Sequence, residues 1–215
     1  MGISFVPVVG SALQVAFNEA AGRRLADRRT RWLNDLAEKV HMLDDQIGDF
    51  AHLTSEDAFM DALTTAAQIA DRTSRAEKLE VLRNAVVNSV MPDAPDLDAQ
   101  QLFFDILDRF TATHMRMLKL FSDPPAWFER QGMAQPDAVG GVDTVEAGMP
   151  ELAGRGDLIN RYADALSIAG LIDQTVSGGQ YLSTNALAAR LRPPRLTSLG
   201  KEFLAFVADP ESKID

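Results

Sequence analysis

The chain carries few of the side chains that perform catalysis. None of its 215 residues is a cysteine, which excludes disulfides, thiolate nucleophiles and cysteine-ligated metal sites. The histidines are His41, His52 and His114, and their spacing matches no zinc motif. His114 stands among apolar residues at helical spacing, so we expect a packed, hydrogen-bonded side chain there rather than a metal ligand. The sequence therefore predicts no metal site.

Carboxylates are the remaining candidates for acid–base chemistry. Asp45 and Asp49 would share a helix face, and so would Asp105 and Asp108. Such pairs can act as general acid and base or hold a divalent cation, but acids at helical spacing most often form a solvated face. The sequence has no glycine-rich phosphate-binding loop and no nucleophile elbow. We therefore expect that the protein is not an enzyme and has no cofactor, and we infer no small-molecule substrate.

Arginines form a dense N-terminal basic cluster. Its members are Arg23, Arg24, Arg28, Arg29 and Arg31, and Asp27 is the only acid among them. From position 35 to position 71 the balance reverses to nine acids and one lysine. A helix that is basic upstream and acidic downstream suits antiparallel self-pairing, because opposite charges then meet. Two alternatives stay open: contact with an anionic membrane surface or other polyanion, and an ordinary solvated helix with local ion pairs.

A second basic cluster lies near the C-terminus, where no acid occurs between positions 174 and 201. Its members are Arg190, Arg192, Arg195 and Lys201. In a winged-helix domain they would stand on or beside the wing, which contacts DNA phosphates or a protein partner. The helix expected before the wing has no face rich in Lys, Arg, Asn or Gln for reading bases. A structural or protein-binding unit is therefore favoured, with DNA binding as the alternative.

A long helix must carry the N-terminal basic cluster, and we expect it to run from near position 8 to about position 50. One stripe follows this helix at steps of seven, four, four, three and four residues: Leu25, Trp32, Leu36, Val40, Leu43 and Ile47. A stripe this regular requires a partner helix, either in the same chain or in a second copy. We therefore predict a homo-oligomer or a complex with a protein partner.

An apolar segment over residues 3–17 precedes the arginines. No basic residue comes before it, unlike in a secretory signal, and it is shorter than the ~20 residues of a membrane span. We expect it to pack in the core or against a partner, and the alternative is an interfacial membrane contact assisted by the arginines. The absence of cysteine fits a reducing compartment, so we expect a cytoplasmic protein, with peripheral membrane association as the alternative.

Further amphipathic stretches predict additional helices and two domains. Helices are expected from a start at Thr54–Asp57 through Ala70, over Leu79–Val90, and from Asp96 or Asp98 to Phe121, with a short helix around Trp127. Glycine and proline are frequent in residues 131–150, which predicts a linker. The expected organisation is a helical domain over 1–130, the linker over 131–150, and a second domain over 151–210.

The last unit has the element order of a winged-helix domain. Asp157–Ala169 predicts an amphipathic helix, which Gly170 would end with a left-handed C-cap. Extended pieces at Leu171-Ile172 and Gln180–Thr184 would form the wing, and Leu196–Gly200 leads into a terminal helix. The predicted fold class is mainly α: a helical bundle or hairpin followed by a small winged-helix-like α+β unit.

Three parts of the chain resemble the abortive-infection alpha (Abi-alpha) proteins of bacteria. These parts are Leu82-Arg-Asn-Ala-Val-Val-Asn88, the stretch Phe104–Leu118, and Ala169–Ile172 with Leu196–Phe203. The resemblance implies phage defence or toxin-like association, and it implies no catalytic residues. We therefore predict a non-enzymatic interaction or regulatory protein that associates through its long helices. The alternatives are a winged-helix DNA-binding regulator and a membrane-acting effector that uses the apolar segment and the N-terminal basic cluster.

Overall fold

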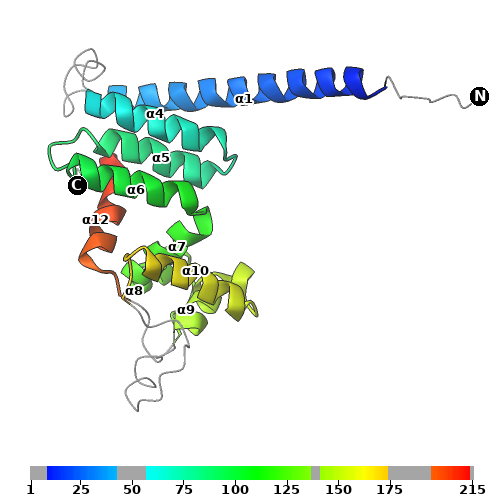
Figure 1. The fold of residues 1–215 in the computed structure, drawn as a ribbon. Helices are drawn as coiled ribbons and strands as arrows, with labels where there is room; N and C mark the ends of the chain where they lie inside the picture. The colour runs from blue at the N-terminus through cyan, green and yellow to red at the C-terminus, as the bar shows by residue number, and fades with distance from the viewer. Residues whose placement is uncertain (1–8, 43–56, 137–140, 174–194, 214–215) are drawn as a thin grey trace, which may run out of the picture.

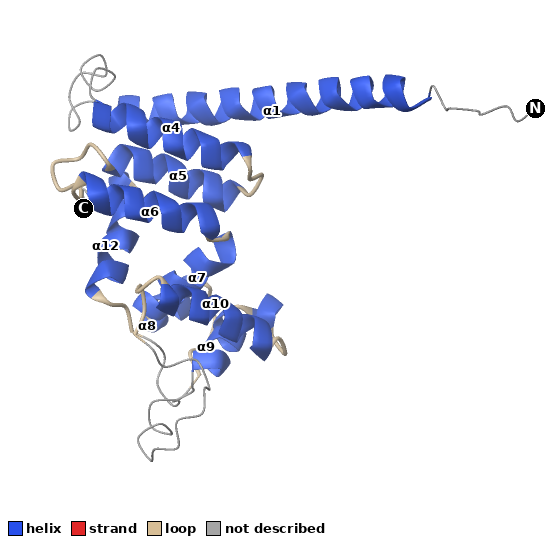
Figure 2. Cartoon of the chain, in the orientation of Figure 1, coloured by secondary structure: helices blue, strands red, loops and turns tan. Residues whose placement is uncertain are grey.

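The computed structural model describes residues 9–42, 57–136, 141–173 and 195–213 (Figure 1, Figure 2). Within those ranges the chain is almost entirely helical and contains one isolated β-bridge but no strand, which confirms the mainly-α prediction. The helices are α1 (Val9–Met42), α4 (Asp57–Asp71), α5 (Ala76–Asn88), α6 (Leu97–Arg109), α7 (Ala112–Ser122), α8 (Pro124–Arg130), α9 (Gly141–Gly148), α10 (Gly156–Ile168) and α12 (Ser198–Val207), with the 3-10 helices η1 (Pro150–Leu152) and η2 (Pro210–Lys213).

Helices α1, α4, α5 and α6 form the upper half of the molecule in Figure 1. Helix α4 contacts α1, α5 and α6, and its buried face contains Ala62, Ala66 and Ala70, whose small side chains let neighbouring helices approach closely. Helix α5 is the most enclosed of the four. From position 81 to position 89 every residue except Arg83 is buried, which places α5 at the centre of the packing.

The helix expected from Asp96 to Phe121 is in fact two helices. Of the two aspartates expected at its start, Asp96 or Asp98, it is Asp96 that caps α6, by accepting a hydrogen bond from the Ala99 N–H at 2.9 Å. The chain then leaves the helical conformation at Phe110 and Thr111, where ψ is 142° and 168°, and α7 begins in a new direction. Phe110 is the C-cap of α6 and Thr111 is the N-cap of α7. The Thr111 N–H donates to His114 Nδ1 at 3.1 Å, so a histidine occupies the position that Glu or Gln takes in an ordinary capping box.

Part of the stretch 131–150, expected as a linker, is packed into the core as α9 and η1. Val145 and Met149 are completely buried there, and the Trp127 indole N–H donates to the Gly148 carbonyl at 2.9 Å. A Cβ at Gly148 would lie 3.2 Å from side-chain atoms of both Leu120 and Trp127. This glycine therefore serves close packing rather than chain flexibility.

The end of α10 follows the expected pattern. Gly170 has a φ of 73°, its N–H donates to Ser167 O at 2.8 Å, and the Leu171 N–H donates to Leu166 O at 3.0 Å. These two bonds are the Schellman arrangement, which satisfies carbonyls that the helix leaves open. The predicted left-handed glycine C-cap is confirmed.

The winged-helix-like α+β unit is not supported by the ranges that the structure covers. Its first expected extended piece contributes a single antiparallel bridge, between Ile172 and Leu196, and no strand. The second piece, Gln180–Thr184, lies outside the described residues. One bridged pair of residues, Ile172 and Leu196, does not make a β-hairpin. The described residues therefore show helix α10, a turn, this bridge and the terminal helix α12.

Helix α12 returns from the lower helices to pack against α5 and α7. Carbonyl groups at its C-terminal end accept hydrogen bonds from two side chains of α5. Asn84 Nδ2 donates to Val207 O at 3.2 Å, and Asn88 Nδ2 donates to Phe206 O at 2.8 Å and to Ala208 O at 2.9 Å. The ring of Phe206 also packs 5.4 Å from that of Phe103. One continuous core therefore extends from α1 to the terminal helix.

Candidate functional site

The upstream half of α1 extends away from the rest of the molecule (Figure 1). Residues 22–27 are helical and all exposed. Arg28 and Arg29 connect α1 to the rest of the molecule. The Arg28 guanidinium donates a hydrogen bond to the Asp71 carbonyl, and Arg29 Nη1 lies 3.6 Å from Asp71 Oδ2. The Trp32 indole N–H then donates to Leu79 O at 3.1 Å. Two of the five clustered arginines thus attach α1 to the end of α4.

The predicted stripe is divided between the core and the surface. Trp32, Leu36 and Val40 are 1–3% exposed, and α1 packs there against α4 and α5, so the partner of this half lies in the same chain. Leu25, on the extending part, is 45% exposed. The last two positions, Leu43 and Ile47, lie outside the described residues.

A second row of residues on α1 faces solvent. Ala26, Thr30, Leu33 and Ala37 follow one another at steps of four, three and four, and all four are exposed, Leu33 by 37%. We call this row the association seam. Small residues around one leucine at this spacing allow a second helix to pack closely.

A charge network fastens the downstream half of α1. Lys39 Nζ lies 2.9 Å from Glu80 Oε1 and 3.1 Å from Asp209 Oδ1. Arg83 joins the same Glu80 carboxylate to Asp35, whose Oδ2 lies 3.0 Å from Arg83 Nη1. Burial alone would lower the pKa of Lys39, but its hydrogen bonds to the two carboxylates outweigh burial and raise it. The network ties α1 to α5 and to the C-terminal segment.

Only half of the C-terminal basic cluster can be placed. Arg190 and Arg192 lie outside the described residues. Arg195 is exposed, and its backbone N–H donates to Asp173 Oδ1 at 2.7 Å. Lys201 is exposed on α12. The described part of the chain therefore does not bring these four residues together.

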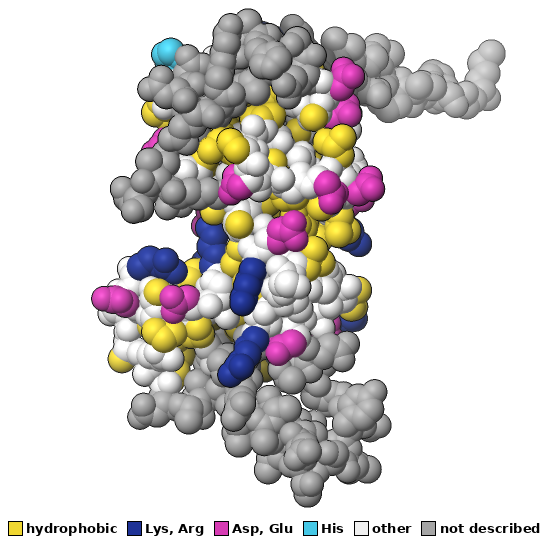
Figure 3. Space-filling model, turned by 90° about the vertical axis from the view of Figure 1, so that its left-hand side faces the viewer, with side chains coloured by type: hydrophobic (Ala, Val, Ile, Leu, Met, Phe, Trp, Pro, Cys, Tyr) yellow, Lys and Arg dark blue, Asp and Glu magenta, His cyan; other side chains and the backbone are white. Residues whose placement is uncertain are grey.

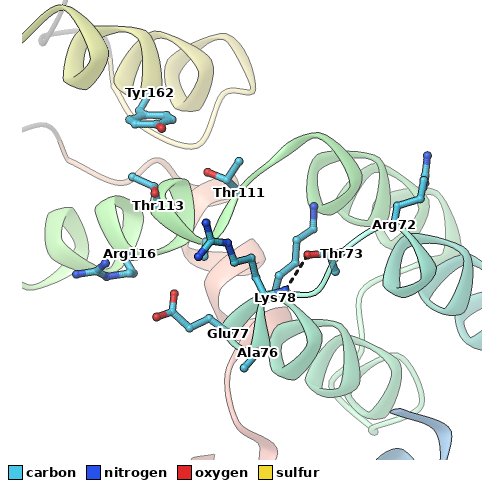
Figure 4. Close-up of a pocket in the computed structure, with 11 residues that line it drawn as sticks. Arg72, Thr73, Ala76, Glu77, Lys78, Thr111, Thr113, Arg116 and Tyr162 are labelled. Carbon is cyan, nitrogen blue, oxygen red and sulfur yellow. Dashed lines mark hydrogen bonds between the residues drawn. The ribbon is translucent and has the colours of Figure 1, made fainter. Parts of the chain in front are cut away.

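A different basic site lies where α5 and α7 begin (Figure 4). It is a cavity of about 540 Å³, here called the basic pocket. Its lining comes from the end of α4, the first turns of α5 and α7, and α10: Arg72, Thr73, Arg75, Ala76, Glu77, Lys78, Thr111, Ala112, Thr113, Arg116 and Tyr162. Four of these side chains are cationic and one is acidic. On the face shown in Figure 3, Asp and Glu side chains are spread mainly over the upper helices, whereas Lys and Arg lie mostly in the lower half.

Lys78 joins the pocket to the end of α6. Its Nζ donates to Phe110 O at 2.7 Å and to Asp108 O at 3.0 Å, both at the negative end of the α6 dipole. An ammonium group has three N–H donors, so one is left after these two bonds. Burial is the main cause that lowers the pKa of Lys78.

Two pocket arginines already have carboxylate partners. Arg72 Nη2 lies 2.7 Å from Asp108 Oδ1, and Arg116 Nη1 lies 2.6 Å from Glu151 Oε1. Arg75 is exposed, and among the described side chains no ion pair is found for it. Arg75 is therefore the guanidinium most available to an incoming group.

His114 contacts two residues that line the pocket, Thr111 and Tyr162. Its ring stacks on Phe110 at 4.5 Å and meets the Tyr162 ring edge-on at 4.7 Å. Burial, with a smaller contribution from the Lys78 charge, lowers the pKa of His114 to about 4. The ring is therefore neutral near pH 7, and its Nδ1 is the acceptor for the Thr111 N–H. His114 is packed and hydrogen-bonded, as expected.

Sequence reasoning missed this pocket because its halves are about 35 positions apart in the chain. The stretch from Arg72 to Lys78 contains three basic residues, but Asp71 and Glu77 beside them give it an ordinary local charge. Thr111 was also hidden, because the apolar stripe continues through it. The sequence signal that could have revealed it is Thr-x-x-His at positions 111–114, which marks the start of a helix within that stripe.

Neither a metal site nor a membrane-crossing helix is found in the described parts of the chain. Within them, no three His, Asp or Glu side chains gather closely enough to hold a metal ion. The described helices include none that combines the length and the hydrophobicity of a membrane span. Comparison of the chain with protein-family models, curated proteins and solved structures gave no match.

Proposed function

We propose that this chain is a non-enzymatic interaction protein of the cytoplasm that self-associates through α1. The observation that carries the proposal is the extension of α1 beyond the body (Figure 1). Residues 9–27 would measure about 28 Å as a helix. Most helical stability in proteins comes from packing of one helix face against other elements rather than from intrinsic propensity. A partner on this part of α1 would supply that packing.

The charges on α1 favour a second copy as that partner. Exposed arginines, among them Arg24, Arg29 and Arg31, precede the exposed acids Asp35 and Glu38. Two copies that pair antiparallel about a two-fold axis near position 31 or 32 place each basic segment beside the acidic segment of the other. The association seam would then lie at the centre, with Ala26 facing Ala37 of the other copy and Thr30 facing Leu33.

The resemblance to Abi-alpha proteins supports a role in phage defence for such an assembly. In that role association itself would be the activity, and no catalytic group is needed. The described residues do not support the winged-helix-like unit, and only Arg195 and Lys201 of the C-terminal basic cluster lie among them. DNA and membrane contact are therefore outcomes of the test rather than parts of the proposal.

Molar mass measured over a range of concentrations tests self-association. Leu33→Glu puts an acid in the association seam at an exposed position, so we expect a folded protein that stays monomeric while the wild type forms dimers. Leu102→Glu is the matched control, because Leu102 is 42% exposed on α6, away from α1. A wild type that is monomeric at every concentration would contradict the proposal, and so would equal association of both variants.

The same samples separate the alternatives. If the wild type stays monomeric but sediments with anionic vesicles, α1 is a membrane-contact helix. If it stays monomeric but retards DNA in a salt-dependent manner, the regulator hypothesis is the better one.

A further inference from the structure

We propose that the basic pocket binds a small molecule through a phosphate group. The pocket has the size of a small-molecule site, and four cationic side chains line it in a chain whose net charge is −10. Gathering like charges costs free energy unless a counter-charge is present. The lining itself offers one carboxylate, Glu77.

The carboxylates behind the lining do not neutralise the whole cluster. Asp108 pairs with Arg72, and Glu151 pairs with Arg116. Together with Glu77 they bring three negative charges to four positive ones. Lys78 contacts only backbone carbonyls in its two hydrogen bonds, and Arg75 has no ion pair among the described side chains. The positive charge that no carboxylate balances therefore lies at the start of α5, on Arg75 and Lys78.

Two helix starts add donors to the same space. Ala76 and Glu77 are the first residues of α5, Ala112 and Thr113 are the first of α7, and all four line the pocket. The first N–H groups of a helix have no acceptor within the helix, and the dipole is positive at that end. These backbone donors complement the cationic side chains in the preference for an anion.

The chemistry of the lining favours phosphate over a simple carboxylate. Guanidinium groups and backbone N–H groups together can bond three or more oxygens arranged around one centre. The hydroxyls of Thr73 and Thr113 are in the same lining and can donate to further oxygens (Figure 4). Tyr162 closes the side opposite α5, and its apolar ring can cover the body of a small molecule.

Calorimetric titration of the full chain tests the site with three probes: inorganic phosphate, pyrophosphate and a mononucleotide. Each is compared with acetate at equal ionic strength. We expect saturable binding of at least one phosphate probe and none of acetate. Arg75→Ala should weaken that binding on the order of tenfold, because one charge-assisted bidentate contact is lost. Arg75 is exposed, so this variant is expected to fold.

Arg130→Ala is the matched control, because Arg130 is exposed on α8 and does not line the pocket. The proposal is overturned if no phosphate probe binds, if acetate binds as well as the phosphate probes do, or if Arg75→Ala binds them as well as the wild type. Leu33→Glu should bind the probe as the wild type does. Loss of self-association and loss of phosphate binding are therefore separate results.

Discussion

Gly200 lies directly against the backbone of Leu171. A Cβ at position 200 would come within 2.0 Å of the Leu171 carbonyl oxygen and 2.9 Å of its carbonyl carbon. The approach is held by Thr197, whose N–H donates to Leu171 O at 3.1 Å and whose hydroxyl donates to Gly170 O at 2.6 Å. The Thr-x-x-Gly sequence at the start of α12 therefore joins the end of α10 to the terminal helix through backbone contact.

Gly200→Ala should destabilise the protein by about 3 kcal/mol, the upper part of the range for overpacking, because backbone rather than a flexible side chain must move. Denaturant unfolding measures the change. Gly22→Ala is the matched control. It lies on α1 with nothing within 4 Å of the added methyl, and we expect a gain of roughly 0.5–1 kcal/mol in helix stability. Equal stability of Gly200→Ala and the wild type would show that α10 and α12 do not meet in this way.

Asn88→Asp should cost at least about 2 kcal/mol of unfolding free energy. The substitution is nearly isosteric, but it removes the amide that donates to Phe206 O and Ala208 O and sets a carboxylate against both. Thermal and denaturant unfolding check the change. Gln135→Glu, an amide-to-acid change at an exposed position, should stay within about 0.5 kcal/mol of the wild type. If the two variants behave alike, α5 does not cap α12.

His114 should make stability depend on pH. Its pKa is about 4 in the folded protein and near 6.5 when unfolded, so the unfolded state takes up the proton first as pH falls. Stability should therefore decrease by roughly 2 kcal/mol between pH 7.5 and pH 5 on account of this one group. His114→Gln keeps an acceptor for the Thr111 N–H but does not titrate, so its stability should change less over that interval. Parallel curves for the two proteins would contradict the buried, neutral histidine.

Lys39→Met should destabilise the attachment of α1. Lys39 is 9% exposed at its side chain and joins Glu80 to Asp209, so its loss leaves two carboxylates with one cation fewer between them. We expect a loss of about 1–2 kcal/mol, since both partners are half exposed and solvent screens the charges. Lys119→Met, at an exposed position on α7, should have little effect. Equal unfolding curves for the two variants would mean that the charge network contributes nothing to the stability of the packing between α1 and α5.

Local features of the fold were predictable, and contacts between distant segments were not. Gly170 was identified as a C-cap and Asp96 as one of two candidate N-caps, because the residue type alone determines what each can do at a helix end. The break at Thr111 was missed because the apolar period continues through it and histidine is an unusual partner for a cap. The glycines of residues 131–150 suggested a linker. At position 148, however, a glycine is needed because the side chains of Trp127 and Leu120 pack against the backbone there.

The candidate sites divide in the same way. The N-terminal basic cluster was visible as a run of arginines, but which of them reach Asp71 depends on how α1 crosses α4. The stripe predicted a partner helix without showing that Trp32, Leu36 and Val40 find theirs in the same chain. The basic pocket forms only because the first turns of α5 and α7 lie close together in the fold. Sequence patterns within either segment do not predict that contact.

Distances between spin labels in the assembled protein test self-association through α1 most directly. The chain has no cysteine, so Thr30→Cys and Gly22→Cys each provide one unique labelling position. Antiparallel pairing about a point near position 31 or 32 predicts a short distance between two labels at 30. Between two labels at 22 it predicts about 28 Å, from 1.5 Å per residue along each helix. Absence of any coupling between molecules, or labels at 22 closer together than labels at 30, would contradict it.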